Sequence, residues 1–216
     1  MRKLLSLCAV SLCIAVQPAM AQDAKAKSVL DGVSKKVSSL KSFKANFSLS
    51  LAGGGGKVNE SKKGTISLKG QKYHVSLTSQ EIISDNKTVW TYNKEAKEVQ
   101  VSNYNASEQT MSPAKMFTPN FYEKEYKYAY KGERKEQGKA CDIVEMTPND
   151  KSKTLARIEL IVDKSTSMIA GANYWEKNGN KYTITVSNFT PNADLPDTYF
   201  SWNPKEHPGV ETVDLR

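Results

Sequence analysis

The chain has 216 residues, of which 38% are hydrophobic and 25% charged, and its formal net charge at pH 7 is +8. These proportions are typical of one ordinary soluble domain, and they exclude a membrane-embedded protein and a two-domain enzyme. The only long apolar run lies at the start, where Arg2 and Lys3 precede Leu4–Val16. We interpret residues 1–21 as a cleaved signal peptide and expect residues 22–216 to form a single exported domain.

An amphipathic helix is predicted near the start of that domain, over residues 24–40. Its apolar residues recur every three or four positions, with lysines between them: Val29, Leu30, Val33, Val37 and Leu40. This spacing places them on one face of a helix, which has to pack against another element.

After residue 42, apolar and polar residues alternate, as in strands with one buried and one exposed face. The first run contains Phe43, Ala45, Phe47, Leu49 and Leu51, all of one parity. Later runs lie at Ile66–Leu68, Tyr73–Leu77, Trp90–Tyr92, Val99–Val101, Tyr126–Tyr130, Val144–Met146, Ile158–Val162, Met168–Tyr174, Tyr182–Val186 and Phe200–Trp202. Turn-forming residues separate them, so the sequence predicts about ten or eleven antiparallel strands. Such a sheet has to curl or split to bury its apolar side.

One segment interrupts the strands. Ser112 and Pro113 form an N-cap followed by proline at the first helical position, and Pro119 ends the helix after Phe117. A helix this short cannot form a core by itself. It either covers an apolar surface or caps the sheet edge as a connector.

The sequence contains no catalytic or metal-binding constellation. Its two histidines, His74 and His207, lie far apart, and Cys141 is the only thiol after residue 21. The carboxylates around Trp90 could support glycoside hydrolysis, but Asp85 is better explained as a turn former. We therefore expect no catalytic residue, no metal and no cofactor, and packing rather than a disulfide to stabilise the domain.

The positive charge is spread over polar faces and mixed with acidic residues, as on a solvated surface. Tyr126, Tyr128 and Tyr130 alternate with lysines, a pattern that could stack on nucleic acid, but export makes nucleic acid an unexpected partner. Attraction to an anionic membrane surface stays open.

Four segments share motifs with one known family. The most specific is Ile82–Asn93, in which Ser84-Asp85-Asn86-Lys87 precedes Val89-Trp90-Thr91-Tyr92-Asn93. The others are Leu40–Phe47, Met146–Pro148, and the tail Phe200–Pro204 with Pro208–Val210. In this order, the motifs resemble the LolA family, the periplasmic carriers of outer-membrane lipoproteins.

The resemblance implies a curled, incomplete antiparallel β-barrel whose concave apolar face is covered by helices and holds the acyl chains of lipoproteins. The residues expected to line this cavity are Phe43, Phe47, Leu49, Ile66, Leu68, Tyr73, Val75, Leu77, Trp90, Tyr92, Val99, Ile158 and Leu160. The residues expected in the covering helices are Val29, Leu30, Val33, Val37, Met111, Met116 and Phe117. The alternative arrangement is a filled core without a cavity.

The implied function is a periplasmic, monomeric, non-enzymatic chaperone. Its partners would be acylated lipoproteins and an ABC-type lipoprotein-releasing complex of the inner membrane, and an outer-membrane acceptor is left open. The family's better-studied members carry an arginine after the second strand that latches the helical lid, whereas this chain has Lys69, Gly70 and Lys72 there. A lysine lacks the planar, bidentate guanidinium. The alternatives are a related protein that binds or senses another lipid or envelope stress, and an exported hydrolase.

Overall fold

The computed structural model describes residues 19–53, 58–105 and 113–216. Its elements in chain order are α1 (Ala19–Ser38), β1 (Phe43–Ala52), β2 (Val58–Lys69), β3 (Lys72–Leu77), β4 (Gln80–Ser84), β5 (Thr88–Asn93), β6 (Glu98–Asn103), α2 (Pro113–Met116), β7 (Tyr126–Glu136), β8 (Lys139–Pro148), β9 (Leu155–Asp163), β10 (Met168–Glu176), β11 (Lys181–Pro191), the 3-10 turns η1 (Asp197–Phe200) and η2 (Pro204–Glu206), and β12 (Glu211–Asp214).

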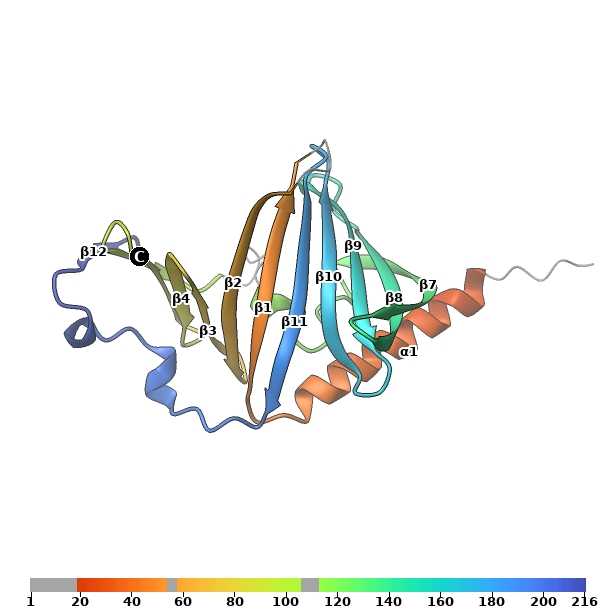
Figure 1. The fold of residues 1–216 in the computed structure, drawn as a ribbon, viewed down its shortest axis with the longest axis horizontal. Helices are drawn as coiled ribbons and strands as arrows, with labels where there is room; N and C mark the ends of the chain where they lie inside the picture. Colours follow the sequence, from red (N-terminus) through yellow and green to blue (C-terminus); the bar gives the residue numbers. More distant parts are fainter. Residues whose placement is uncertain (1–18, 54–57, 106–112) are drawn as a thin grey trace, which may run out of the picture.

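The strands form one long, open sheet in the order β12-β6-β5-β4-β3-β2-β1-β11-β10-β9-β8-β7 (Figure 1). Neighbours are antiparallel, except that β12 runs parallel to β6. Because β7 and β12 lie at the two ends of this order, the sheet curls without closing. The predicted fold, an incomplete antiparallel barrel with helices on its concave face, is confirmed.

The first helix and strand follow the predicted periodicities. Phe43, Ala45 and Phe47 of β1 are buried and alternate with exposed Lys44 and Asn46. The helix α1 packs against β7, β8 and β10. Its bounds differ from the prediction, since it extends from Ala19 to Ser38 rather than from residue 24 to residue 40. No helix in the described part of the chain is both long and apolar enough to cross a bilayer.

The tight turn between β4 and β5 depends on its polar residues. The Asp85 carboxylate accepts hydrogen bonds from the backbone N–H groups of Lys87 (2.8 Å) and Thr88 (2.7 Å). Asn86 has a φ of 75°, a left-handed conformation that asparagine tolerates better than most residues. This turn sets the register in which Ser84 lies opposite Val89.

The segment after β11 runs along the convex side of β2–β6 and returns to the sheet as β12 (Figure 1). The predicted strand Phe200–Trp202 is wrong, because this segment forms the turn η1 instead. Phe200 is fully buried, and the Tyr199 carbonyl lies 3.2 Å from His74 Nδ1. The C-terminal segment therefore gives this half of the sheet a second packed layer on its convex side.

Candidate functional site: the concave face of the sheet

The concave face is built by cross-strand register, since residues directly opposite in adjacent antiparallel strands point to the same side. Phe43 lies opposite Leu68, which in turn lies opposite Tyr73. In the next row, Ile66 lies opposite Val75. Ten of the predicted cavity residues belong to, or pack against, the main apolar cluster of this face: Phe43, Phe47, Leu49, Ile66, Leu68, Tyr73, Val75, Leu77, Ile158 and Leu160.

Gly64 of β2 makes room for one of these side chains. It lies opposite Phe47. A Cβ atom at Gly64 would approach the Phe47 ring to 2.9 Å and the Ser76 carbonyl oxygen to 2.4 Å. The absent side chain therefore lets the Phe47 ring lie over β2 on the concave side.

The helical residues expected to cover this face also reach the cluster. Val29, Leu30 and Val33 of α1 are buried in it, and Val37 packs against it. Met116 and Phe117, at the end of α2, are buried as well, and the rings of Phe117 and Phe43 lie 4.8 Å apart. Met111 lies outside the described residues. The second helix therefore packs on the concave side of β1 rather than capping a sheet edge.

Polar contacts that the sequence did not reveal attach α1 to the segment after α2. The Tyr122 hydroxyl donates a hydrogen bond to the Asp31 carboxylate, and the Asn120 N–H donates to Ser34 Oγ (2.9 Å). Burial, and then the Asp31 carboxylate, raises the pKa of the Tyr122 phenol. Hydrogen bonds from Lys27 and Tyr122 lower the pKa of Asp31. In the sequence, Asp31 and Ser34 are polar helix residues of the kind that usually face solvent. The sequence therefore does not predict that they attach α1 to the segment after α2.

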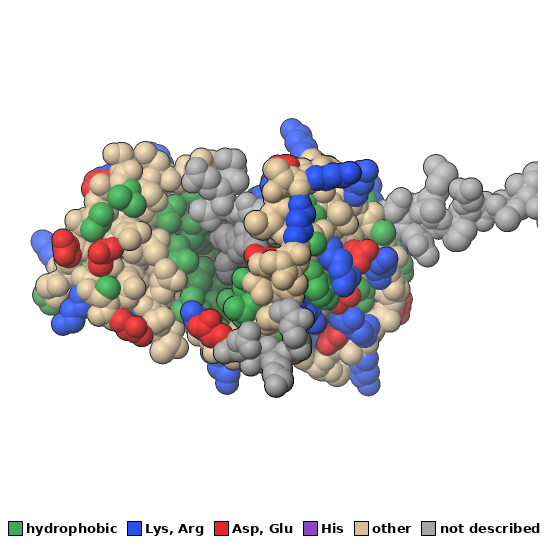
Figure 2. Space-filling model, turned by 90° about the horizontal axis from the view of Figure 1, so that it is seen from above, with side chains coloured by type: hydrophobic (Ala, Val, Ile, Leu, Met, Phe, Trp, Pro, Cys, Tyr) green, Lys and Arg blue, Asp and Glu red, His purple; other side chains and the backbone are tan. Residues whose placement is uncertain are grey.

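The described residues do not cover the concave face completely. Seen from above, the molecule is hollowed between its β3–β6 part and its β7–β10 part, and hydrophobic side chains gather in the hollow (Figure 2). On the same face, Leu49, Leu77, Ile82 and Tyr182 are only partly buried. A cavity of about 220 Å³ also lies between the last turn of α1 and β1, lined by Val37, Leu40, Phe43 and Leu68 among others. The apolar layer thus contains open space rather than being packed throughout.

Three predicted cavity residues, Trp90, Tyr92 and Val99, lie on the other side of the sheet. Trp90 is opposite Ile83, and Ile83 is opposite His74. This row faces the C-terminal segment. In the next row Tyr92 is opposite Val99, and its ring lies 4.9 Å from that of Trp202 and 5.2 Å from that of His207.

The error has a physical reason. Strand β4 was not predicted, and its adjacent residues Ile82 and Ile83 point to opposite faces. In β5 and β6 the packed face is the convex one, under the C-terminal segment, whereas Thr91 and Gln100 share the concave side with Ile82. Apolar parity in β5 therefore does not identify the concave side.

The two lysines considered as substitutes for a lid-latching arginine bind elsewhere. The ammonium groups of Lys69 and Lys72 lie 2.8 Å and 3.0 Å from the carboxylate of Asp197, and Lys69 also donates to the Leu195 carbonyl (2.9 Å). Both lysines therefore attach the C-terminal segment to the β2–β3 turn. The helix α1 is instead attached through Asp31 and Ser34.

The described residues contain no group of three or more histidine, cysteine or acidic side chains that could hold a metal ion. Cys141 is buried, and burial raises the pKa of its thiol, so the reactive thiolate is disfavoured. The side chains that gather on the concave face are mainly apolar.

An open antiparallel sheet with helices across an apolar concave face defines the class of binding and carrier folds. The family described as "Outer membrane lipoprotein carrier protein LolA" matches residues 38–203 of this chain. The chain belongs to the LolA family.

One solved structure shares the fold at low sequence identity, and others align less closely. An uncharacterized conserved protein from Thermus thermophilus aligns with a TM-score of 0.61 and 13% identity, over 88% of this chain and 99% of the other. A LolA superfamily protein from Nitrosomonas europaea aligns with a TM-score of 0.45 and 15% identity, over 82% and 97% of the two chains. A DUF1329 family protein from Desulfovibrio piger aligns with a TM-score of 0.47 and 17% identity, also over 82% and 97%. No curated protein sequence matches this chain.

Proposed function

We propose that this protein is a periplasmic carrier that binds the acyl chains of lipoproteins on its concave face and moves them from the inner to the outer membrane. The observation that carries the proposal is the partly uncovered apolar layer between α1, α2 and the sheet, which is hollowed and lined by aliphatic and aromatic side chains. Membership of the LolA family supports the same function.

The energetics of acyl chains explain why such a surface is needed. Each methylene group exposed to water costs about 0.8 kcal/mol. A lipoprotein with several long acyl chains therefore cannot cross an aqueous compartment unshielded. A partly open apolar groove offers shelter while leaving room for chains of different number and length.

We further propose that residues 1–21 direct export and that the protein acts as a monomer without catalytic activity. Its donor would be an ABC-type lipoprotein-releasing complex of the inner membrane, and an outer-membrane acceptor would receive the cargo. The partly uncovered apolar layer of the concave face supports a carrier.

Substitutions at two adjacent residues of β1, whose side chains point to opposite faces of the sheet, test whether the groove binds acyl chains. Leu49 lies on the concave face opposite Ile184, whereas Ser48 lies on the convex face opposite Thr185. We expect Leu49→Glu to weaken binding of a fluorescent fatty acid about tenfold or more, because the probe would have to displace or neutralise a charge in an apolar groove. The control Ser48→Glu should bind as tightly as the parent. Equal loss in both variants, or no probe binding by the delipidated parent, would contradict the groove.

The cargo is tested by native mass spectrometry of protein purified from the periplasm. A bound acylated protein is the expected result. Free lipid alone would instead support a protein that binds or senses another lipid, and would contradict lipoprotein transport.

A further inference from the structure

A second opening lies in the wall of the sheet, between β10 and β11. These strands pair only from Gly171 to Trp175, opposite Thr185 to Lys181. Strand β10 begins three residues earlier, at Met168, and β11 continues to Pro191. Over these unpaired lengths the two strands diverge toward the C-terminal end of α1 (Figure 1). The divergence leaves a gap in an otherwise continuous sheet.

Two local features fix the shape of this gap. At its closed end, a Cβ atom on Gly171 would lie 2.5 Å from the Ile184 carbonyl oxygen, so only glycine allows the strands to approach this closely. Along β11, Asn188 has a φ of 50°, and the register with β1 shifts between Lys44 and Asn46. This bulge bends β11 away from β10 while β11 stays paired with β1.

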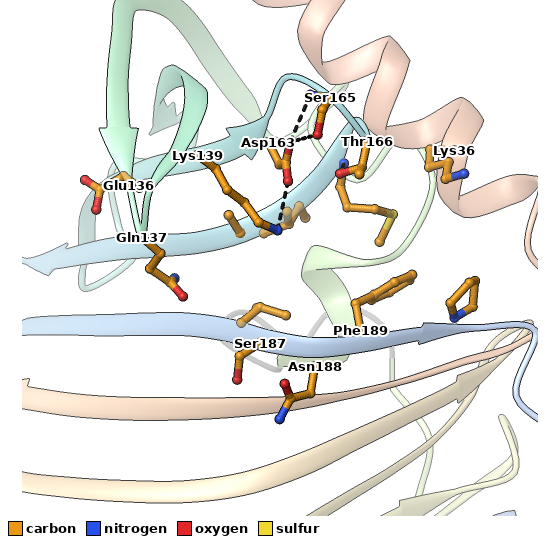
Figure 3. Close-up of a pocket in the computed structure, with 15 residues that line it drawn as sticks. Lys36, Glu136, Gln137, Lys139, Asp163, Ser165, Thr166, Ser187, Asn188 and Phe189 are labelled. Atoms are coloured by element: carbon orange, nitrogen blue, oxygen red, sulfur yellow. Dashed lines mark hydrogen bonds and ion pairs between the residues drawn. The ribbon is translucent and has the colours of Figure 1, made fainter.

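A cavity of about 520 Å³, open to solvent on one side, lies in the gap. That volume lies within the range of small-molecule binding sites. Apolar side chains from the main cluster line it, namely Met168, Ile169, Val186 and Phe189. Phe189 extends from β11 toward β10 (Figure 3). This apolar part of the lining is suited to a hydrocarbon chain. Most of the remaining lining is polar or charged: Lys36, Glu136, Gln137, Lys139, Asp163, Ser165, Thr166, Ser187 and Asn188.

The charges around the cavity differ in how they are compensated. Lys139 lies 3.0 Å from Asp163, whose carboxylate also accepts hydrogen bonds from Ser165 Oγ (2.6 Å) and Ser165 N (2.9 Å). Burial alone would raise the pKa of Asp163, but these donors outweigh it and lower the pKa to about 2. Lys36, on the last turn of α1, also lines the cavity and has no carboxylate partner among the described residues. It is the cation available to a ligand.

We propose that the gap between β10 and β11 is a second lipid site, which binds one alkyl chain bearing an anionic head group. The chain lies against Met168, Val186 and Phe189, and the head group pairs with Lys36. A fatty acid and a lysophospholipid share this chemistry. The site adjoins the groove assigned to lipoprotein acyl chains, since the Phe189 and Phe43 rings lie 5.1 Å apart. The position of a bound probe distinguishes the two assignments.

Photolabelling tests the location. The full-length exported protein is irradiated with palmitate carrying a terminal diazirine, and in a second arm with the corresponding lysophosphatidylglycerol, and the labelled residues are mapped by mass spectrometry. We expect label within residues 168–171 and 186–190 from at least one probe, and the arm that labels identifies the head group. Label confined to Phe43 and Phe117 would overturn this inference while supporting the concave groove. Label confined to the gap would support this inference and contradict the concave groove.

A filling substitution provides the matched control. Ala170 lines the gap, whereas Ala129 of β7 lies in another part of the sheet, and both are half-buried alanines. We expect Ala170→Trp to reduce labelling in the gap about tenfold or more and to leave labelling at Phe43 unchanged. Ala129→Trp should label like the parent. Circular dichroism checks that both variants are folded. If they are, equal labelling of the gap in Ala170→Trp and Ala129→Trp would contradict a lipid site in the gap.

The head group is tested at Lys36. We expect Lys36→Gln to weaken palmitate binding in the gap about fivefold, because the charge-assisted contact is lost, and Lys36→Arg to retain it. Hexadecanol, which has no anionic group, should bind the parent and Lys36→Gln alike. An equal effect of Lys36→Gln on palmitate and hexadecanol would overturn the assignment of the head group.

Discussion

Glu81 lies between Lys94 and His74, and His74 in turn contacts the C-terminal segment. Its carboxylate lies 2.9 Å from the Lys94 ammonium and 3.4 Å from His74 Nε2. The other ring nitrogen of His74 lies 3.2 Å from the Tyr199 carbonyl. Both ring nitrogens therefore lie close to oxygen atoms, one on Glu81 and one on the C-terminal segment. The His74 side chain, followed by Lys94, lowers the pKa of Glu81 to about 2 against the opposing effect of burial.

This lowered pKa predicts a pH-dependent contribution to stability. A carboxyl group whose pKa falls on folding stabilises the protein above its ordinary value near 4.5, and this contribution is lost as the pH falls toward 2. We expect Glu81→Gln to lower the free energy of unfolding by about 2 kcal/mol at pH 7. Urea titrations at pH 7 and pH 3 should show a smaller difference from the parent at pH 3.

The exposed Glu95, in the turn between β5 and β6, supplies the control for this measurement. Glu95→Gln should leave the free energy of unfolding within about 0.5 kcal/mol of the parent, as is usual for surface substitutions. A pH-independent loss in Glu81→Gln would show that Glu81 acts by packing rather than by charge.

At the scale of elements, α1 is held by few polar groups at one side of a large apolar contact. Tyr122 is completely buried, and its ring packs edge-on against Tyr128 at 5.6 Å. Its hydroxyl reaches Asp31 on α1. Removing this hydroxyl would therefore weaken the attachment of the helix without removing the aromatic packing.

We expect Tyr122→Phe to lower the free energy of unfolding by about 1–2 kcal/mol and to speed the uptake of a fluorescent fatty acid, since α1 would separate from the sheet more often. Stopped-flow mixing measures the uptake rate. The control is Tyr130→Phe, which removes the hydroxyl that donates to Asp142 (2.7 Å) between β7 and β8. Comparable destabilisation by Tyr130→Phe without faster uptake is expected. Faster uptake in both variants would contradict a gating role for the Asp31–Tyr122 contact.

Whether the apolar parity of a strand predicts the direction of its side chains depends on which of its faces is packed. Strand β1 has one packed face, and its parity correctly predicted that Phe43 and Phe47 point inward. In β5 the packed face lies under the C-terminal segment, so the same reasoning placed Trp90 on the wrong side. The gap between β10 and β11 has no periodic signal at all, because it depends on a close backbone approach at Gly171 and a bulge at Asn188.

Across the whole molecule, the C-terminal segment makes the two halves of the sheet energetically different. Only the β2–β6 half has this layer on its convex side, and the fully buried Phe200 lies in that layer. Hydrophobic residues buried to this degree usually contribute several kcal/mol to stability. The stability of this half should therefore depend on a segment distant in the chain, since contacting residues such as His74 and Tyr199 are 125 positions apart.

We expect Phe200→Ala to cost about 3–4 kcal/mol and to raise amide hydrogen exchange in β3–β5 more than in β8–β9. Leu215 provides the control, because it belongs to the same segment but is 61% exposed. Leu215→Ala should change neither stability nor exchange measurably. A uniform rise in exchange over the whole sheet after Phe200→Ala would show that the two halves unfold as one unit.

The open edges of the sheet also have a mechanical consequence. In a closed barrel, the circumference is fixed by a continuous ring of backbone hydrogen bonds, and widening it means breaking some of them. Here β7 and β12 lie at opposite ends of the strand order. The sheet can therefore flatten or tighten through small changes in twist at each strand pair, with every ladder intact. This flexibility would let the same sheet enclose ligands of different width without breaking backbone hydrogen bonds.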